Sequence, residues 1–303
     1  MEKLMLIVNP KAGKGQGAKA LGNIISVFSR YGYITCVYMT TAGGDATRFA
    51  QKYGSDYDRL VCIGGDGTLS EVLEGLMRLE KDERPTIGYI PMGTANDVAA
   101  SLALSKKPTD AAETVVTGIE TDLDVGKMNG RAFSYIVAFG AFTEVPYTTS
   151  QDTKNILGHL AYIIEGIGRI GDIKTHHATV TYDDGVIEGD FIFGCIMNTL
   201  SVGGIVKFDP SDVGLSDGYF EIILVNELKN VGDLSAIVAA VTSGNFNNES
   251  ITFLHTKKAR FEFSEPVSWT RDGEDGGTHI DVTVENNNCA VKILVSGGES
   301  GVI

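Results

Sequence analysis

Paired cysteines, long apolar runs and an excess of positive charge are all missing from this 303-residue sequence. Its four cysteines lie far apart and form no CxxC pair, which argues against a disulfide framework or a zinc site. The apolar runs are much shorter than the roughly 20 residues that cross a bilayer, and the first ten residues lack the features of a signal peptide. We therefore expect a cytoplasmic protein with no transmembrane segment.

The charge balance excludes one class of partner. With 25 Lys and Arg against 39 Asp and Glu, the formal net charge is −14. Nucleic-acid binding requires clustered basic residues, so we expect no nucleic-acid partner. An anionic membrane would also repel such a chain, so any membrane contact should be transient and local. The first 30 residues differ, because they hold five basic residues and one acidic residue, a local balance of +4.

Strand and helix signals alternate from residue 3 to about residue 120. This alternation predicts an N-terminal doubly wound α/β domain with a parallel sheet. The expected strands are residues 3–9, 35–40, 59–63 and 86–90, and the expected helices are residues 18–31, 45–53, 68–79 and 95–102.

The pattern changes after about residue 122. Short β-branched or aromatic segments follow, separated by Gly, Asn and Asp turns such as residues 182–185 and 285–288, which are typical of hairpins. Helical patterns interrupt them at residues 155–170 and 231–243. We therefore predict a domain of residues 1–122 and a C-terminal antiparallel β-sandwich domain of residues 123–303 with helical insertions. Whether residues 297–303 return to the first domain stays open.

Three polar, glycine-rich clusters follow strands of the predicted parallel sheet, where α/β proteins bind ligands. They are Asn9–Gly17, Gly64–Glu71 and Pro91–Asp97. Glycines allow backbone N–H groups to approach a phosphate, and Lys14 adds positive charge. The first cluster lacks the GxxxxGK[ST] spacing of a P-loop and could be a solvated turn, and Asn96 or Asp97 could simply cap a helix.

In order and spacing, these clusters resemble the catalytic domain shared by diacylglycerol kinases and bacterial soluble lipid kinases. The central Gly64-Gly65-Asp66-Gly67-Thr68 element also resembles that of NAD kinases. The resemblance implies an N-terminal NAD kinase/diacylglycerol kinase-like α/β domain and a C-terminal β-sandwich, with the active site in the cleft between them.

Two elements of the second half extend the resemblance. Leu215–Glu221 is similar to a family segment in which an Asp and backbone carbonyls hold a structural Mg²⁺, which here implies Gly214, Asp217 and Tyr219. Trp269–Glu274 is similar to the family's DGE element, which implies Asp272 as catalytic base. From the residues alone, both could be ordinary turns. Phe139–Glu144 departs from the family's Gly-Phe-Asp-Ala-like segment, and this weakens any statement about the acceptor.

The resemblance implies an ATP- and Mg²⁺-dependent kinase that phosphorylates a lipid hydroxyl, most simply that of diacylglycerol or a related lipid. Asp66 and Glu274 would organise the catalytic metal. The implied nucleotide contacts are Asn9, Lys14, Thr40, Gly64, Gly65, Asp66, Gly67, Thr68, Glu71, Gly93, Thr94, Asn96 and Asp97. The partner would be a lipid at the membrane surface, contacted transiently, and a homodimer stays open. The alternatives are a small-metabolite kinase of the NAD kinase type and a non-catalytic nucleotide-binding protein.

Overall fold

The computed structural model describes residues 2–141, 173–202, 206–207, 214–228 and 248–297, with a few isolated positions from 232 to 246. The predicted helix at 155–170, residues 142–144 of the departing segment and residues 298–303 lie outside the described residues. The predicted helix at 231–243 is described only in part.

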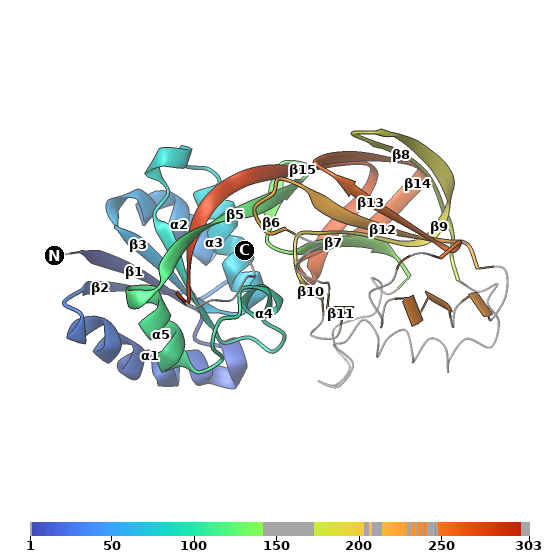
Figure 1. Cartoon of the computed structure of the whole chain (residues 1–303). Helices are drawn as coiled ribbons and strands as arrows, with labels where there is room; N and C mark the ends of the chain where they lie inside the picture. The colour runs from blue at the N-terminus through green and yellow to red at the C-terminus, as the bar shows by residue number, and fades with distance from the viewer. Residues whose placement is uncertain are drawn as a thin grey trace.

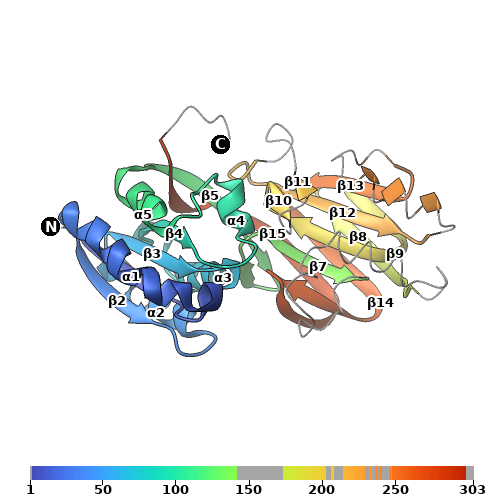
Figure 2. The ribbon, with the colours of Figure 1, turned by 90° about the horizontal axis from the view of Figure 1, so that it is seen from below.

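The N-terminal half is a parallel sheet with one layer of helices above it and one below it in Figure 1, and Figure 2 looks onto the lower layer. Strands β1 (Lys3–Val8), β2 (Ile34–Met39), β3 (Arg59–Gly64) and β4 (Thr86–Pro91) lie in the order β4-β3-β1-β2. Helices α1 (Ala12–Arg30) and α5 (Pro108–Thr117) pack on one face, and α2 (Asp45–Tyr53) and α3 (Asp66–Leu76) pack on the other. Strands covered on both faces need apolar residues at successive positions, which explains the nearly unbroken apolar run of β1.

Two helices begin earlier than the sequence predicts. Helix α1 begins at Ala12 rather than at residue 18, and α3 begins at Asp66 rather than at residue 68. In α1, Gly13 and Gly15 take φ angles of 58° and 84°, so the expected glycine-rich loop is the irregular first turn of the helix. Helix α5 was not predicted, whereas α4 (Asp97–Ser101) lies inside its predicted range.

The C-terminal half is antiparallel. Its main strands are β5 (Ile119–Met128), β6 (Arg131–Phe133), β7 (Ile136–Gly140), β8 (His176–Tyr182), β9 (Gly185–Met197), β12 (Phe220–Asn226), β13 (Ile251–Thr256), β14 (Lys258–Arg271) and β15 (Glu274–Val295), with a short separate pair β10 (Ser201–Val202) and β11 (Val206–Lys207). Strands β7 and β8 each pair with both β9 and β14, so the strands enclose an apolar core. Phe139 lies at its centre, 4.9 Å from the Trp269 ring between centroids.

Strand β15 joins the two halves (Figure 1). It pairs with β14 and β5, and near its end Ile293 pairs in parallel with Ile87 of β4. The parallel and antiparallel regions are thereby one 13-stranded sheet. The expected domain boundary at residues 122–123 falls inside β5.

The predicted hairpin at residues 285–288 is wrong, because β15 continues through it. The pairing of β15 with β5 changes register between Asn287 and Val291, and Cys289 has a φ of 47°. Asparagine-rich sequences suit bulges as well as turns, so the pattern alone could not separate the two. The hairpin at residues 182–185 is confirmed, since Tyr182 of β8 pairs with Gly185 of β9.

No helix in the described part of the chain has both the length and the apolar character needed to cross a membrane.

Strand β15 provides a test of the shared sheet. Ile293 is fully buried, whereas Ile280 of the same strand is 52% exposed. We expect Ile293→Ala to lower the free energy of unfolding by about 2–5 kcal/mol, because it leaves a cavity where β15 meets β4. Ile280→Ala should stay within about 0.5 kcal/mol of wild type. Chemical denaturation followed by circular dichroism measures both, and equal losses would contradict the described packing.

Candidate active site

The three glycine-rich clusters meet at the carboxyl ends of β1, β3 and β4. The Asn9 side-chain amide donates to Thr68 Oγ1 at 3.1 Å, and the Asn9 N–H donates to the Ile63 carbonyl at 2.9 Å. A Cβ atom on Gly13 would lie 2.5 Å from the Met92 carbonyl oxygen. The first cluster therefore touches both of the others, as the strand-end positions predict.

Glycine is required where the second and third clusters touch. A Cβ atom on Gly93 would lie 2.7 Å from Gly65 Cα, and one on Gly64 would lie 2.5 Å from the Thr68 side chain. Only residues without a side chain allow these approaches. Glycines at the start of a helix let an anion approach the backbone closely, and the helix N-terminus favours a phosphate there.

Asn96 closes the third loop instead of capping the following helix. Its φ is 55°, in the left-handed region, and its side chain forms no capping hydrogen bond. Instead, Asn96 Oδ1 accepts the Gly93 N–H at 2.8 Å and Asn96 Nδ2 donates to the Gly93 carbonyl at 2.9 Å. This closed loop leaves Thr94 exposed, while Asp97 is buried at the start of α4.

Asp66 is a buried carboxyl group among other acids. It is 9% exposed and accepts the Val98 N–H at 3.4 Å. Burial, followed by the nearby charges of Asp97 and Asp272, raises the pKa of Asp66 to about 6. A bound cation would favour the ionised form again, which suits the predicted role at a metal.

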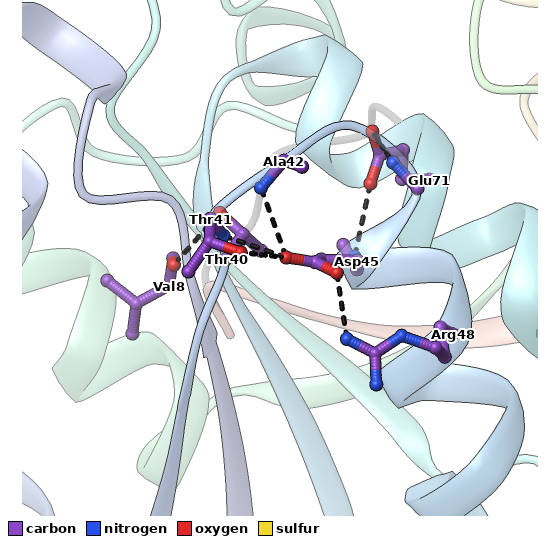
Figure 3. A network of polar contacts seen from close by, with 9 residues as sticks. Val8, Thr40, Thr41, Ala42, Asp45, Arg48 and Glu71 are labelled. Carbon is purple, nitrogen blue, oxygen red and sulfur yellow. Dashed lines mark hydrogen bonds and ion pairs between the residues drawn. The ribbon is translucent and has the colours of Figure 1, made fainter.

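The segment after β2 forms a tight turn beside the cleft (Figure 3). The Thr40 N–H and hydroxyl donate to the Val8 carbonyl at 2.9 and 3.3 Å. Asp45 accepts hydrogen bonds from the Thr41 N–H and hydroxyl and pairs with Arg48 at 2.8 Å. The Arg48 guanidinium and the Thr41 donors lower the pKa of Asp45. These contacts fix the positions of Gly43 and Gly44, which line the cleft described below.

Glu71 joins α3 to the start of α2. Its Oε1 accepts the Gly44 N–H at 2.9 Å and its Oε2 accepts the Ala46 N–H at 3.1 Å. Both oxygens are thus used at a helix N-terminus, where a carboxylate is favoured. The predicted nucleotide contact of Glu71 stays a prediction. Lys14 lies in α1, and its side chain is outside the described part.

Asp272 lies in the turn between β14 and β15, but it is not a solvated turn residue. Asp272 and Gly273 have φ angles of 48° and 78°, as a tight Asp-Gly hairpin requires. The Asp272 side chain is only 6% exposed. Its Oδ2 accepts the Ser134 N–H at 2.6 Å, and its Oδ1 accepts the N–H groups of Tyr135 and Ile136 at 3.0 and 3.2 Å.

A cleft of about 260 Å³ brings these parts together. A Cβ atom on Gly67 would lie 3.0 Å from Glu274 Oε1, so the turn after β14 reaches the start of α3. The lining residues are Gly43, Gly44, Thr47, Gly67, Ser70, Glu71, Glu74, Arg131, Arg271, Asp272 and Glu274. Of the predicted site residues, Gly67 and Glu71 of the first half and Asp272 and Glu274 of the second therefore line one space, whereas Asp66, Thr40 and Thr94 are not among its lining residues.

The predicted structural metal site is a separate group that does not line this cleft. Asp217 Oδ1 accepts the Tyr219 N–H at 2.9 Å, and a Cβ on Gly214 would lie 2.5 Å from Asp217 Oδ2. Beside it, the Glu221 carboxylate is 1% exposed and accepts no hydrogen bond from a described residue, and its Oε1 lies 3.8 Å from His255 Nε2. Burial and the Asp217 charge raise the pKa of Glu221 to about 8. Oxygen donors next to a buried carboxylate fit a hard cation.

Sequence reasoning missed Asp124, a fully buried carboxylate in β5. Its Oδ2 accepts the Gly218 N–H at 2.6 Å, and its Oδ1 accepts from the Cys289 N–H at 2.6 Å and the Asn288 amide at 3.1 Å. Asp124 thus ties the Asp217 loop to the bulge in β15. Burial raises its pKa. The available signal was an acidic residue between two apolar ones, Leu123 and Val125.

The fold and site define an α/β class of protein in which glycine-rich strand ends and carboxylates of a second, antiparallel half meet at one cleft. Consistently, the family model described as the diacylglycerol kinase catalytic domain matches residues 3–128. A diacylglycerol kinase of Bacillus subtilis (strain 168) is 32% identical over 279 residues, covering 91% of each chain. One from Staphylococcus saprophyticus is 35% identical over 281 residues, 91% of this chain and 90% of that one. A crystal structure of a diacylglycerol kinase from Bacillus anthracis str. Sterne has a TM-score of 0.77 and 26% identity, covering 98% of this chain and 97% of that one.

The chain belongs to the diacylglycerol kinase family. The predicted family and the predicted fold class are confirmed. Membership in this kinase family implies the use of ATP, usually with a divalent metal.

The raised pKa of Asp66 predicts a pH-dependent stability in the absence of metal. Because the folded-state pKa of about 6 lies above the ordinary value of 3.8, stability from this group is complete below about pH 4 and is lost as the pH rises through 6. We expect a loss of about 3 kcal/mol between pH 4 and 7. Urea denaturation in EDTA measures it, with Asp66→Asn as the control that lacks this titration. A constant difference between the two proteins across this range would contradict the shift.

Proposed function

We propose that this protein is a Mg²⁺-dependent lipid kinase that transfers the γ-phosphate of ATP to the hydroxyl group of diacylglycerol or a related lipid. Residues 1–122 would bind the nucleotide, and residues 123–303 would supply the base and the acceptor site. The observation that carries the proposal is the approach of the Asp272–Glu274 turn to the glycine-rich start of α3, where Gly67 lies against the Glu274 carboxylate.

The nucleotide phosphates would lie near Gly65–Thr68 at the start of α3 and beside Thr94, with Lys14 adding positive charge. The partial positive charge at the start of α3 supports this position, since that helix spans 11 residues. Phosphoryl transfer depends mainly on positioning and charge compensation, and it needs little covalent chemistry from the protein. The close-packed glycine loops provide such positioning.

Asp272 would act as the general base. Three backbone N–H groups orient its carboxylate, and Oδ2, which accepts the Ser134 N–H alone among the described residues, has a lone pair for a further hydrogen bond. A lipid hydroxyl bonded to this oxygen would lose its proton to Asp272 as the hydroxyl oxygen attacks the γ-phosphorus.

Two places would hold Mg²⁺. Asp66 and Glu274 would bind the catalytic ion, which when bound neutralises charge on the phosphate oxygens. The Asp217 carboxylate, with the carbonyls of Gly214 and Tyr219, would hold a structural ion. Among the described residues, no three His, Cys, Asp or Glu side chains gather as a ready metal cluster. Mg²⁺ commonly takes one or two carboxylates and completes its shell with phosphate or water.

The acceptor implies a cytoplasmic protein that visits the membrane surface. With a net charge of −14, its contact with an anionic leaflet would be brief and would depend on local surface features. The +4 balance of the first 30 residues supports a local contact of this kind.

The test is phosphorylation from ATP and Mg²⁺ of diacylglycerol, a sphingoid base and phosphatidylglycerol in mixed micelles, with NAD as a further acceptor. We expect diacylglycerol or a related lipid to be phosphorylated. Asp272→Asn should lower kcat by about 10²–10⁴-fold, because it removes the proton acceptor but keeps the shape of the side chain. Asp275→Asn is a matched control, since this exposed acid of the same turn does not line the cleft.

Phosphorylation of NAD but of no lipid would overturn the proposed acceptor class. Full activity of Asp272→Asn would reject the base assignment and leave the acceptor class in place.

A further inference from the structure

Two arginines face the cleft of this acidic protein. Arg131 and Arg271 line it together with Glu71, Glu74, Asp272 and Glu274. With four carboxylates so close, both guanidinium groups would be expected in ion pairs, but neither forms one among the described residues. The reason is that most of these carboxylates already accept hydrogen bonds from other groups.

The acids of the cleft are already engaged. The two oxygens of Glu71 accept backbone N–H groups at the start of α2. Those of Glu74 take the Ala132 N–H and pair with Arg78 at 2.8 Å. Asp272 accepts three backbone N–H groups. In the described part of the cleft this leaves Glu274, which the proposed function assigns to the metal.

Arg131 is placed at the cleft by a tight hairpin. Asn129 and Gly130, with φ angles of 47° and 79°, turn the chain from β5 into β6, and Arg131 is the first residue of β6. Its exposed side chain makes no hydrogen bond or ion pair with any described residue. Nothing in the fold accounts for an arginine at this position.

Arg271 is anchored but not neutralised. It precedes Asp272, and its Nη1 donates to the Ala132 carbonyl at 2.9 Å, while its other N–H groups have no partner among the described residues. Burial and the neighbouring charge of Arg131 lower the pKa of Arg271, while the charges of the nearby Asp272, Glu74 and Glu274 act in the opposite direction without forming an ion pair with it. Arginine nevertheless stays protonated in proteins, so the cleft holds two neighbouring positive charges that repel each other.

A half-buried guanidinium beside a like charge is unfavourable unless an anion binds there. A planar guanidinium group can donate two parallel hydrogen bonds to two oxygens of one phosphate. An ammonium group cannot match this geometry or this strength. The same cleft is lined by Gly67 at the start of α3 and by Asp272, the proposed base. A phosphate at this position would lie between the nucleotide loops and the acceptor.

We propose that Arg131 and Arg271 form an arginine clamp for the phosphoryl group that is transferred, first as the γ-phosphate of ATP and then as the phosphomonoester of the product. The proposal rests on the proposed function. In the reaction, the bond from the γ-phosphorus to the oxygen bridging to the β-phosphate breaks, its electron pair leaves with ADP, and the acceptor oxygen forms the new bond. The hydroxyl proton passes to Asp272, and the clamp compensates the charge on the three phosphoryl oxygens that do not react.

The test compares two nucleotides that differ only in the clamped phosphate. Calorimetric titration with Mg²⁺ and either ATP or ADP, without acceptor, measures Kd for wild type and Arg131→Ala. We expect Kd for ATP to rise by about ten- to hundredfold, because charge-assisted hydrogen bonds to the γ-phosphate are lost. Kd for ADP should stay within about twofold, because ADP lacks that phosphate. A short-chain phosphatidic acid, titrated separately, probes the product side and should also bind more weakly.

Lys127→Ala is the matched control. Lys127 is a cation of the same hairpin, paired in register with Ala132, but it does not line the cleft. Its removal should leave both nucleotide affinities unchanged. Arg131→Lys keeps the charge but not the planar group, so it should recover only part of the ATP affinity. Because Arg131 is exposed and has no described partner, thermal unfolding of Arg131→Ala should match wild type. Arg271→Ala also loses the hydrogen bond to the Ala132 carbonyl. Its nucleotide affinities are therefore compared with wild type only if its thermal unfolding is unchanged as well.

Each outcome decides the proposal. Equal losses for ATP and ADP, or unchanged affinity for ATP and phosphatidic acid, would overturn the clamp. A loss for only one of the two probes would assign the clamp to that side of the reaction. If no lipid is phosphorylated by the wild type, the proposed function fails, but a loss of affinity for ATP and not for ADP in Arg131→Ala would still support the clamp.

Discussion

The cradle of three backbone N–H groups around Asp272 is the interaction on which the arrangement of the cleft depends. It joins the turn between β14 and β15 to the segment between β6 and β7, and so fixes where the following Glu274 and the preceding Arg271 can reach. A buried carboxylate without such donors would be strongly destabilising. The same hydrogen bonds that make burial tolerable thus also orient the group that carries the proposed chemistry.

Around this cradle, polar groups divide into those with partners and those without. Glu71, Glu74 and Asp272 accept hydrogen bonds from backbone N–H groups, Glu74 also pairs with Arg78, and all three line the cleft. Glu274 and Arg131 have no described partner. Away from the cleft, the buried Glu221 carboxylate accepts no hydrogen bond from a described residue and has only His255 Nε2 at 3.8 Å. Most buried polar groups in folded proteins are hydrogen-bonded, so Glu221 is the exception among these acids.

Much of this arrangement could be predicted from local patterns. Three glycine-rich clusters after successive strands had to meet, because parallel strands bring their carboxyl ends to one edge. Asp124 and Arg131 could not be found in this way, because their surroundings come from distant parts of the sequence: Asp124 accepts the Cys289 N–H, and Arg131 lines one cleft with the Asp272 turn. The error at Asn286–Asn288 has the same origin. Whether such residues form a turn or a bulge is decided by the strand on the other side of the ladder, and no local pattern contains that information.

The continuity of β15 has a mechanical consequence. One unbroken strand begins at Glu274 in the cleft and ends beside β4, the strand that leads into the Gly93 loop. Kinases that close on their substrates usually rotate two lobes about a few loop residues. Here such a rotation would have to shear a ladder of backbone hydrogen bonds or bend the strand at its bulge near Cys289. Strand β15 therefore links the two sides of the cleft by a continuous, hydrogen-bonded segment of chain. If the two halves move relative to each other, the bulge beside Asp124 is the place where this strand bends most easily.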